Sequence, residues 1–69
     1  MKNINYDLVK LLHSLSDIVW RLEKHYLGDA KESKCRSVSA LEQILDETRR
    51  HIEMVRDEIK MRMDAGIFD

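Results

Sequence analysis

Apolar residues recur three and four positions apart in two separate stretches of the chain, and this repeat constrains the fold more than any other feature. The spacing places them on one face of an α-helix, in the pattern of a coiled-coil seam. The polar, serine-rich segment GDAKESKCRSVS separates the two stretches. We therefore predict an all-α fold, an antiparallel two-helix hairpin in which facing residue numbers add to 66 or 67. Its expected core consists of Leu8, Leu11, Leu15, Ile18, Leu22, Leu41, Leu45, Thr48, Ile52, Val55 and Ile59.

Signals at both ends set the expected bounds of the first helix. Asn5 can cap its N-terminus, because a side-chain amide oxygen accepts a bond from the free N–H groups of a first turn. Gly28 can end the helix in a left-handed conformation. The first helix is expected over about residues 6–27.

The start of the second helix has two candidates. Capping boxes open at Asp29 and at Ser39, and the earlier one would begin the helix directly after a tight turn. We favour Ser39, which gives a connection over about residues 28–38 and a second helix over about 39–65. Gly66 is placed to close that helix. The 69 residues are accordingly expected to form a single domain.

The first helix carries more apolar surface than one partner helix can cover. At 100° per residue its apolar side chains span roughly 200° of the circumference, against roughly 100° on the second helix. The only tryptophan, Trp20, lies far from the expected seam. Exposed apolar patches usually mark interfaces, so we expect two copies to pair through this strip as a homodimeric four-helix bundle. Glu23 interrupts the strip and is expected to meet a basic residue of the second copy. The strip consists of Val9, Leu12, Ser16, Val19, Trp20 and Leu27.

Chain length and composition support self-association. A chain this short buries only about 60% of its unfolded surface, and one cysteine cannot form an internal disulfide, so a partner subunit is the expected source of added stability. The 12 basic and 13 acidic residues are interspersed, which gives no field that would attract phosphate backbones or anionic lipid. The chain has no signal-like or membrane-spanning apolar run, and its lone cysteine suits a reducing compartment. We expect a cytoplasmic protein.

Residues that could carry chemistry are few and scattered. His13 with Asp17, and Glu47 with His51, are spaced by four and are the only weak metal candidates. Because the two pairs point in different directions within one hairpin, no metal site is expected. Cys35 is expected to be an inert loop thiol. The sequence lacks a nucleophile motif and a glycine-rich phosphate loop, so we expect neither an enzyme nor a cofactor.

These observations predict a small non-catalytic interaction protein, regulatory or adaptor in role, that pairs with itself or with a larger protein. The alternative is an RNA-binding regulator of the helical-hairpin dimer type, which would use Lys31, Lys34 and Arg36 of the connection or Arg49 and Arg50 of the second helix. A metal-binding helical bundle is a third, less favoured hypothesis.

Overall fold

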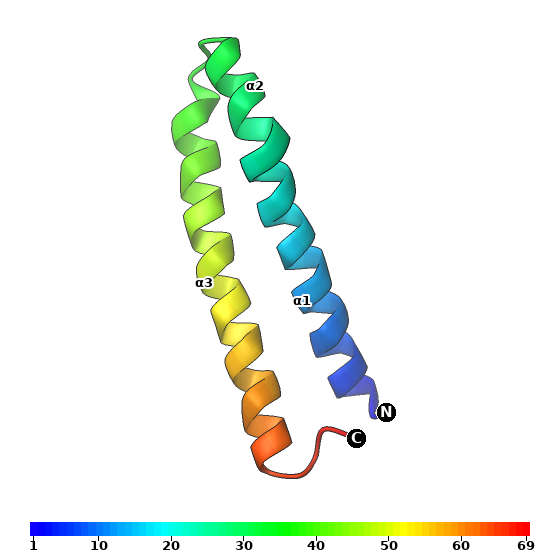
Figure 1. Cartoon of the computed structure of the whole chain (residues 1–69). Helices are drawn as coiled ribbons and strands as arrows, with labels where there is room; N and C mark the ends of the chain where they lie inside the picture. The colour runs from blue at the N-terminus through cyan, green and yellow to red at the C-terminus, as the bar shows by residue number, and fades with distance from the viewer.

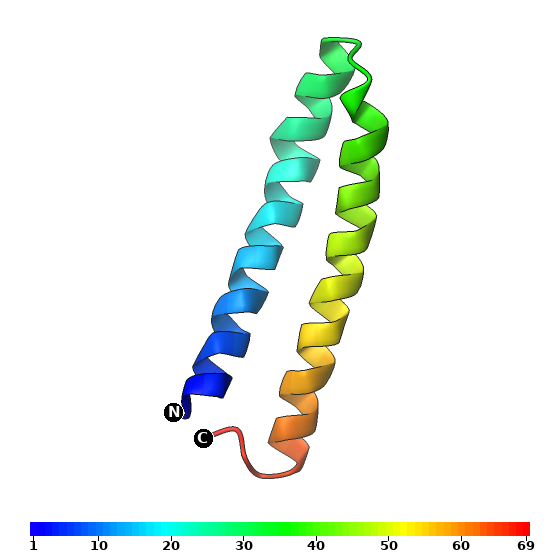
Figure 2. The same ribbon diagram turned by 180° about the vertical axis from the view of Figure 1, so that it is seen from behind.

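The computed structural model describes all 69 residues and consists of two antiparallel helical rods joined at one end (Figure 1). The first rod comprises α1 (Asn3–Arg21), a π-helical segment η1 (Leu22–Tyr26) and α2 (Leu27–Glu32), and the second rod is α3 (Ser37–Asp64). Views from opposite sides show the rods next to each other along their length (Figure 2). The all-helical fold with two rods is confirmed, and no strand is present.

The molecule is a thin rod. Its extents are 49 × 16 × 14 Å, and its radius of gyration is 15.4 Å. A compact domain of this length would have a radius of about 11 Å. None of the helices combines the length and the apolar character that a membrane span requires.

The first rod begins earlier and ends later than predicted. Lys2 is its N-cap, and Asn5 lies inside the first turn with no capping bond. Gly28 lies within α2 and keeps an ordinary helical backbone, so it does not end the helix. Ala30, two residues beyond, is buried. Continued packing of this turn thus outweighs the roughly 1 kcal/mol that glycine costs inside a helix.

The connection is a four-residue turn over 33–36, shorter than the predicted 28–38 segment. The backbone N–H of Lys34 donates to the Lys31 carbonyl over 3.1 Å, and that of Cys35 donates to the Ala30 carbonyl over 3.1 Å. These two bonds are those of a Schellman motif, which requires a left-handed residue at its centre. Lys34 occupies that position with φ +53°.

Neither predicted capping box begins the second rod. Asp29 lies within α2, and Ser39 lies inside α3, which starts two residues earlier at Ser37. The N-cap of α3 is Arg36, and it makes no side-chain capping bond. The tight turn over 33–36 determines where α3 starts, because it brings the chain back next to the first rod by Ser37.

The C-terminal end of α3 confirms the role predicted for Gly66. This glycine has φ +72°, and its N–H donates to the Met63 carbonyl over 3.0 Å. The N–H of Ile67 donates to the Arg62 carbonyl over 2.9 Å, which completes a second Schellman motif. The chain then turns back toward its own N-terminus (Figure 1).

The seam between the rods differs in part from the predicted core. Leu11 and Ile18, predicted to be buried, are 46% and 41% exposed, whereas Leu12 and Val19 are half-buried. On a helical wheel Leu12 and Val19 lie near the middle of the apolar arc, so α3 covers its centre and leaves both edges open. The observed seam consists of Asn5, Leu8, Leu12, Leu15, Val19, Leu22, Leu27, Ala30, Val38, Leu41, Leu45, Thr48, Ile52, Val55, Ile59 and Arg62.

The π-helical segment shifts the register of the first rod by one residue. The N–H of Leu27 bonds to the carbonyl of Leu22, five residues back, so this turn holds one residue more than an α-turn. The extra residue rotates the rest of the rod, and Leu27 and Ala30 face α3 while Tyr26 is exposed. Leu27, which was predicted to lie in an intermolecular interface, is half-buried within the hairpin.

Candidate functional site

Two broad faces of the hairpin can be told apart by one ion pair. The guanidinium Nη2 of Arg49 on α3 donates to Oε1 of Glu23 on η1 over 2.8 Å. Residues spaced by seven lie along one side of a helix in such a seam. Positions 9, 16 and 23 of the first rod and 42, 49, 56 and 63 of the second therefore border one face, named here the Glu23 face. The opposite face, named the Leu11 face, is bordered by Ile4, Leu11, Ile18, Ile44, His51 and Glu58.

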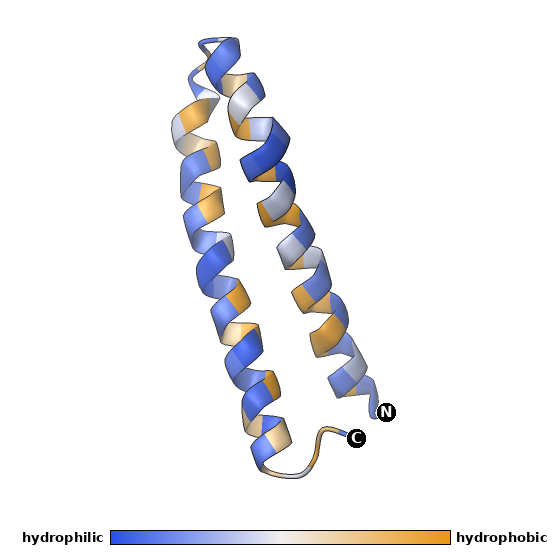
Figure 3. Ribbon diagram, in the orientation of Figure 1, coloured by the Kyte–Doolittle hydropathy of each residue, from blue (hydrophilic) through white to orange (hydrophobic).

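The Leu11 face is rich in exposed aliphatic side chains. Ile4 and Ile44 are 47% and 45% exposed, close to the values for Leu11 and Ile18. Met54 and Met61 follow at its outer edge on α3 and are also exposed. Apolar positions run along the facing sides of both rods, whereas the outer side of α3 is largely hydrophilic (Figure 3).

The Glu23 face is more polar. Ser16 and the Glu23–Arg49 ion pair occupy its centre, and the basic residue predicted to meet Glu23 from a second copy is thus supplied by the same chain. Arg56 lies farther along this face, 3.5 Å from Glu53. Its exposed apolar residues are Val9 and Met63, with Trp20 at the outer edge.

Trp20 packs against its own rod. Its indole meets the His25 ring edge-on, with 5.2 Å between centroids. Side chains five apart do not adjoin on an α-helix, but the wider π-turn brings them together. The indole remains 51% exposed.

The six residues predicted to form one interface strip are divided by the structure. Val9, Ser16 and Trp20 are exposed, whereas Leu12 and Val19, like Leu27, are half-buried within the hairpin. The predicted strip assumed that α3 covers one edge of the apolar arc. Because α3 covers its middle, the uncovered apolar surface forms two strips.

The surface area of the chain shows how incomplete its burial is. Only six of 69 residues are buried, and four of these are hydrophobic: Leu22, Ala30, Leu45 and Val55. The accessible surface is 5332 Å², whereas a compact monomer of this mass exposes about 4,500 Å². The difference is about the 800 Å² that each partner buries in a protein interface of standard size.

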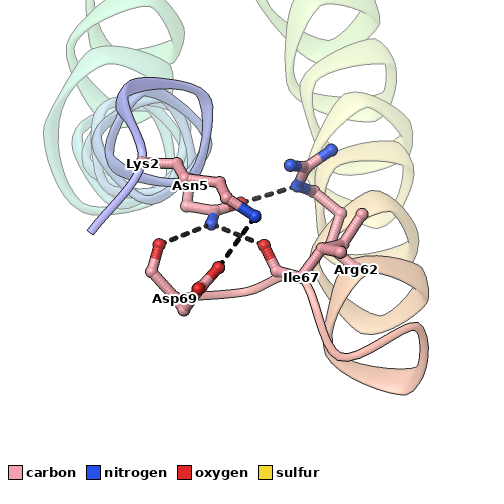
Figure 4. Close-up of polar contacts among 5 residues, drawn as sticks. All are labelled: Lys2, Asn5, Arg62, Ile67 and Asp69. Carbon is pink, nitrogen blue, oxygen red and sulfur yellow. Dashed lines mark hydrogen bonds and ion pairs between the residues drawn. The ribbon is translucent and has the colours of Figure 1, made fainter.

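A polar cluster joins the rods at the open end of the hairpin (Figure 4). The fully buried Asn5 donates from Nδ2 to the backbone oxygens of Ile67, over 2.9 Å, and Asp69, over 3.1 Å. Its Oδ1 accepts a 2.6 Å bond from Nε of Arg62. The Lys2 ammonium lies 2.9 Å from the Asp69 carboxylate and lowers the pKa of that group.

The seam register in the sequence also indicates the contact between Asn5 and Arg62. Asn5 was predicted to be an N-cap instead, because its residue type and position suit that role. The residue numbers 5 and 62 add to 67, which is the sum predicted for residues that face each other across the seam. The predicted register therefore places Asn5 opposite Arg62.

The weak metal candidates are not brought together. Asp17 accepts a 2.8 Å hydrogen bond from Nε of Arg21, and Glu47 accepts a 3.1 Å bond from Gln43. His13 and His51 are exposed. No group of three or more histidine, cysteine or acidic side chains is arranged to hold a metal ion.

Cys35 is an exposed, free thiol at the turn. Ser37 lowers its pKa by hydrogen bonding through its hydroxyl and its backbone N–H, and the N–H lies 3.2 Å from the sulfur. Lys31, Lys34 and Arg36 are exposed around the same turn. Arg49 is engaged by Glu23 and Asp46.

No protein family, curated protein or solved structure matches this chain.

Proposed function

We propose that this chain is a small non-catalytic interaction protein, regulatory or adaptor in role, that self-associates through the apolar residues of its first rod that α3 leaves uncovered. The observation that carries this proposal is the exposure of aliphatic side chains on both sides of the seam. Contiguous exposed apolar surface usually marks a binding surface.

The thin core supports the same proposal. A single layer of two helices buries few side chains, and a domain this small needs further burial to reach ordinary stability. Association supplies it, because a partner that binds only the folded chain stabilises that state by mass action. A second copy is available wherever the chain is made.

Light scattering coupled to size-exclusion chromatography, over a concentration series in the micromolar range, tests the proposal. We expect a mass of twice 8.2 kDa, together with a melting temperature that rises with protein concentration. A folded monomer whose melting temperature is independent of concentration would contradict it.

RNA binding is a second candidate function, and one observation favours it: the exposed cluster of Lys31, Lys34 and Arg36 around the turn. Such a cluster would contact phosphates, and binding would weaken steeply with salt. A mobility-shift assay at low salt tests this, with the triple glutamine variant of these residues as the comparison. No retardation of RNA or duplex DNA by the unmodified chain would exclude this function.

A further inference from the structure

Resting on the proposed self-association, we propose that a second copy of this chain docks on the Leu11 face, with the Glu23 face and Trp20 left outside the contact. Two hairpins then stack in two layers as a four-helix bundle.

The difference between the faces selects the Leu11 face. Its α1 side carries only aliphatic residues, Ile4, Leu11 and Ile18, whereas the corresponding positions of the Glu23 face are Val9, Ser16 and Glu23. Docking on the Glu23 face would bury the Glu23–Arg49 ion pair, and removing charges from water costs several kcal/mol per ion before any compensation. The Leu11 face carries no charged residue at its α1 positions, and Glu58 is the one carboxylate that borders it on α3.

The aliphatic stripe is self-complementary. Ile4, Leu11 and Ile18 read the same in both directions and span about 21 Å of helix. A twofold axis beside Leu11 would therefore place the two Leu11 side chains against each other and Ile4 of each copy against Ile18 of the other. Contacts of this kind, in which the same patch serves both subunits, are those of twofold dimers.

The dimensions of the hairpin also fit a second copy. The two largest extents of the hairpin, 49 and 16 Å, give a projected area of about 780 Å² over both rods, which is comparable to the roughly 800 Å² per partner of a standard interface. On the Leu11 face the border residues of α1 are all aliphatic, whereas those of α3 are Ile44 near the turn and the polar residues His51 and Glu58 farther along.

Charged substitutions on the two faces test the proposal in the full-length chain. We expect Leu11→Glu and Ile18→Glu to weaken dimerisation by at least about 100-fold, since each places two carboxylates in the contact. Val9→Glu and Trp20→Glu are the matched controls and should leave the dimer mass unchanged. The Trp20 fluorescence maximum should stay constant when the unmodified dimer dissociates on dilution.

Disulfide trapping keeps the test decisive if a charged variant fails to fold. In a Cys35→Ala background, Leu11→Cys should form a disulfide-linked dimer under mild oxidation, and Trp20→Cys should not. A dimer that is lost in Trp20→Glu and retained in Leu11→Glu, or trapped through position 20 alone, would overturn the assignment of the face while leaving self-association intact. A monomeric unmodified chain would instead refute the proposed function on which it rests.

Discussion

Arg62 and Asn5 join the two rods at the open end of the hairpin, where Nε of Arg62 donates to Oδ1 of Asn5 over 2.6 Å. The Asn5 amide group donates to the backbone oxygens of Ile67 and Asp69, so every polar atom of this fully buried side chain has a partner. Buried polar groups of this kind are expensive unless satisfied, and a satisfied set fixes one arrangement against its alternatives. The pair thereby fixes the longitudinal register of α1 against α3.

Replacing Asn5 by alanine should lower the free energy of unfolding by about 2 kcal/mol, because it removes three hydrogen bonds and leaves the Arg62 guanidinium without its acceptor. Urea unfolding followed by circular dichroism measures this. Asn3→Ala is the control, since Asn3 is exposed in the same turn and should change the stability little. Equal stabilities for the two variants would show that the cluster does not stabilise the fold.

Lys34→Gly should raise the free energy of unfolding by about 1 kcal/mol. The left-handed backbone of Lys34 strains a residue with a side chain, and relief of this strain exceeds the flexibility that glycine adds to the unfolded chain. A higher thermal midpoint is the expected readout. Lys31→Gly, three residues earlier in α2, should lower stability by about 1 kcal/mol instead. Destabilisation by Lys34→Gly would contradict the turn geometry.

Deletion of Lys24 should leave the hairpin folded with its stability changed by less than about 1 kcal/mol. The π-turn holds one extra residue, and its removal gives a regular α-helix in which Leu22 and the residues after the turn keep their positions against α3. Deletion of Lys10 is the matched comparison. It rotates Leu8 by 100° relative to Leu12, so one of them must leave the seam. Circular dichroism and urea unfolding distinguish the two deletions, and loss of the fold on deleting Lys24 would contradict this account.

The Cys35 thiol should be alkylated with a pH midpoint below that of an unperturbed cysteine, because hydrogen bonds from Ser37 stabilise the thiolate and lower its pKa. Ser37→Ala removes the hydroxyl and should raise the midpoint, while the backbone N–H keeps part of the effect. The pH dependence of the reaction rate with iodoacetamide measures both. Ser39→Ala should leave the midpoint unchanged, and a midpoint in the unmodified chain equal to that of cysteine in an unstructured peptide would contradict the hydrogen-bonded arrangement.

Local patterns predicted the elements but placed several of their ends incorrectly. The left-handed end at Gly66 was predictable, because a glycine directly after a helical pattern commonly ends the helix in the left-handed conformation. Gly28 carried the same signal and is helical, since Ala30 beyond it still packs on α3. Asn5 could serve as a cap in any isolated helix, and only the returning chain end gave it better hydrogen-bond partners.

The sequence predicted how much apolar surface the first rod would leave exposed, but not which residues would form each exposed strip. The excess of apolar circumference on the first rod was evident from the sequence, and exposed Leu11, Ile18 and Trp20 are its consequence. Which of these residues lie together was not evident. The apolar arc of the first rod spans about 200°, so a partner helix can pack on its edge or on its middle. The seam residues are spaced by three and four in both cases.

By itself, the sequence determined an all-helical chain of two amphipathic rods, the helix end at Gly66 and the surplus of apolar surface, because periodicity and turn chemistry are local properties. Only the tertiary structure decided that Leu12 and Val19, and not Leu11 and Ile18, face α3, and that a π-turn realigns the seam from Leu22 to Ala30. The physical reason is that burial and the hydrogen bonds of Asn5 depend on residues about 60 positions apart in the chain, and their sum selects one of several seams that the local pattern allows equally.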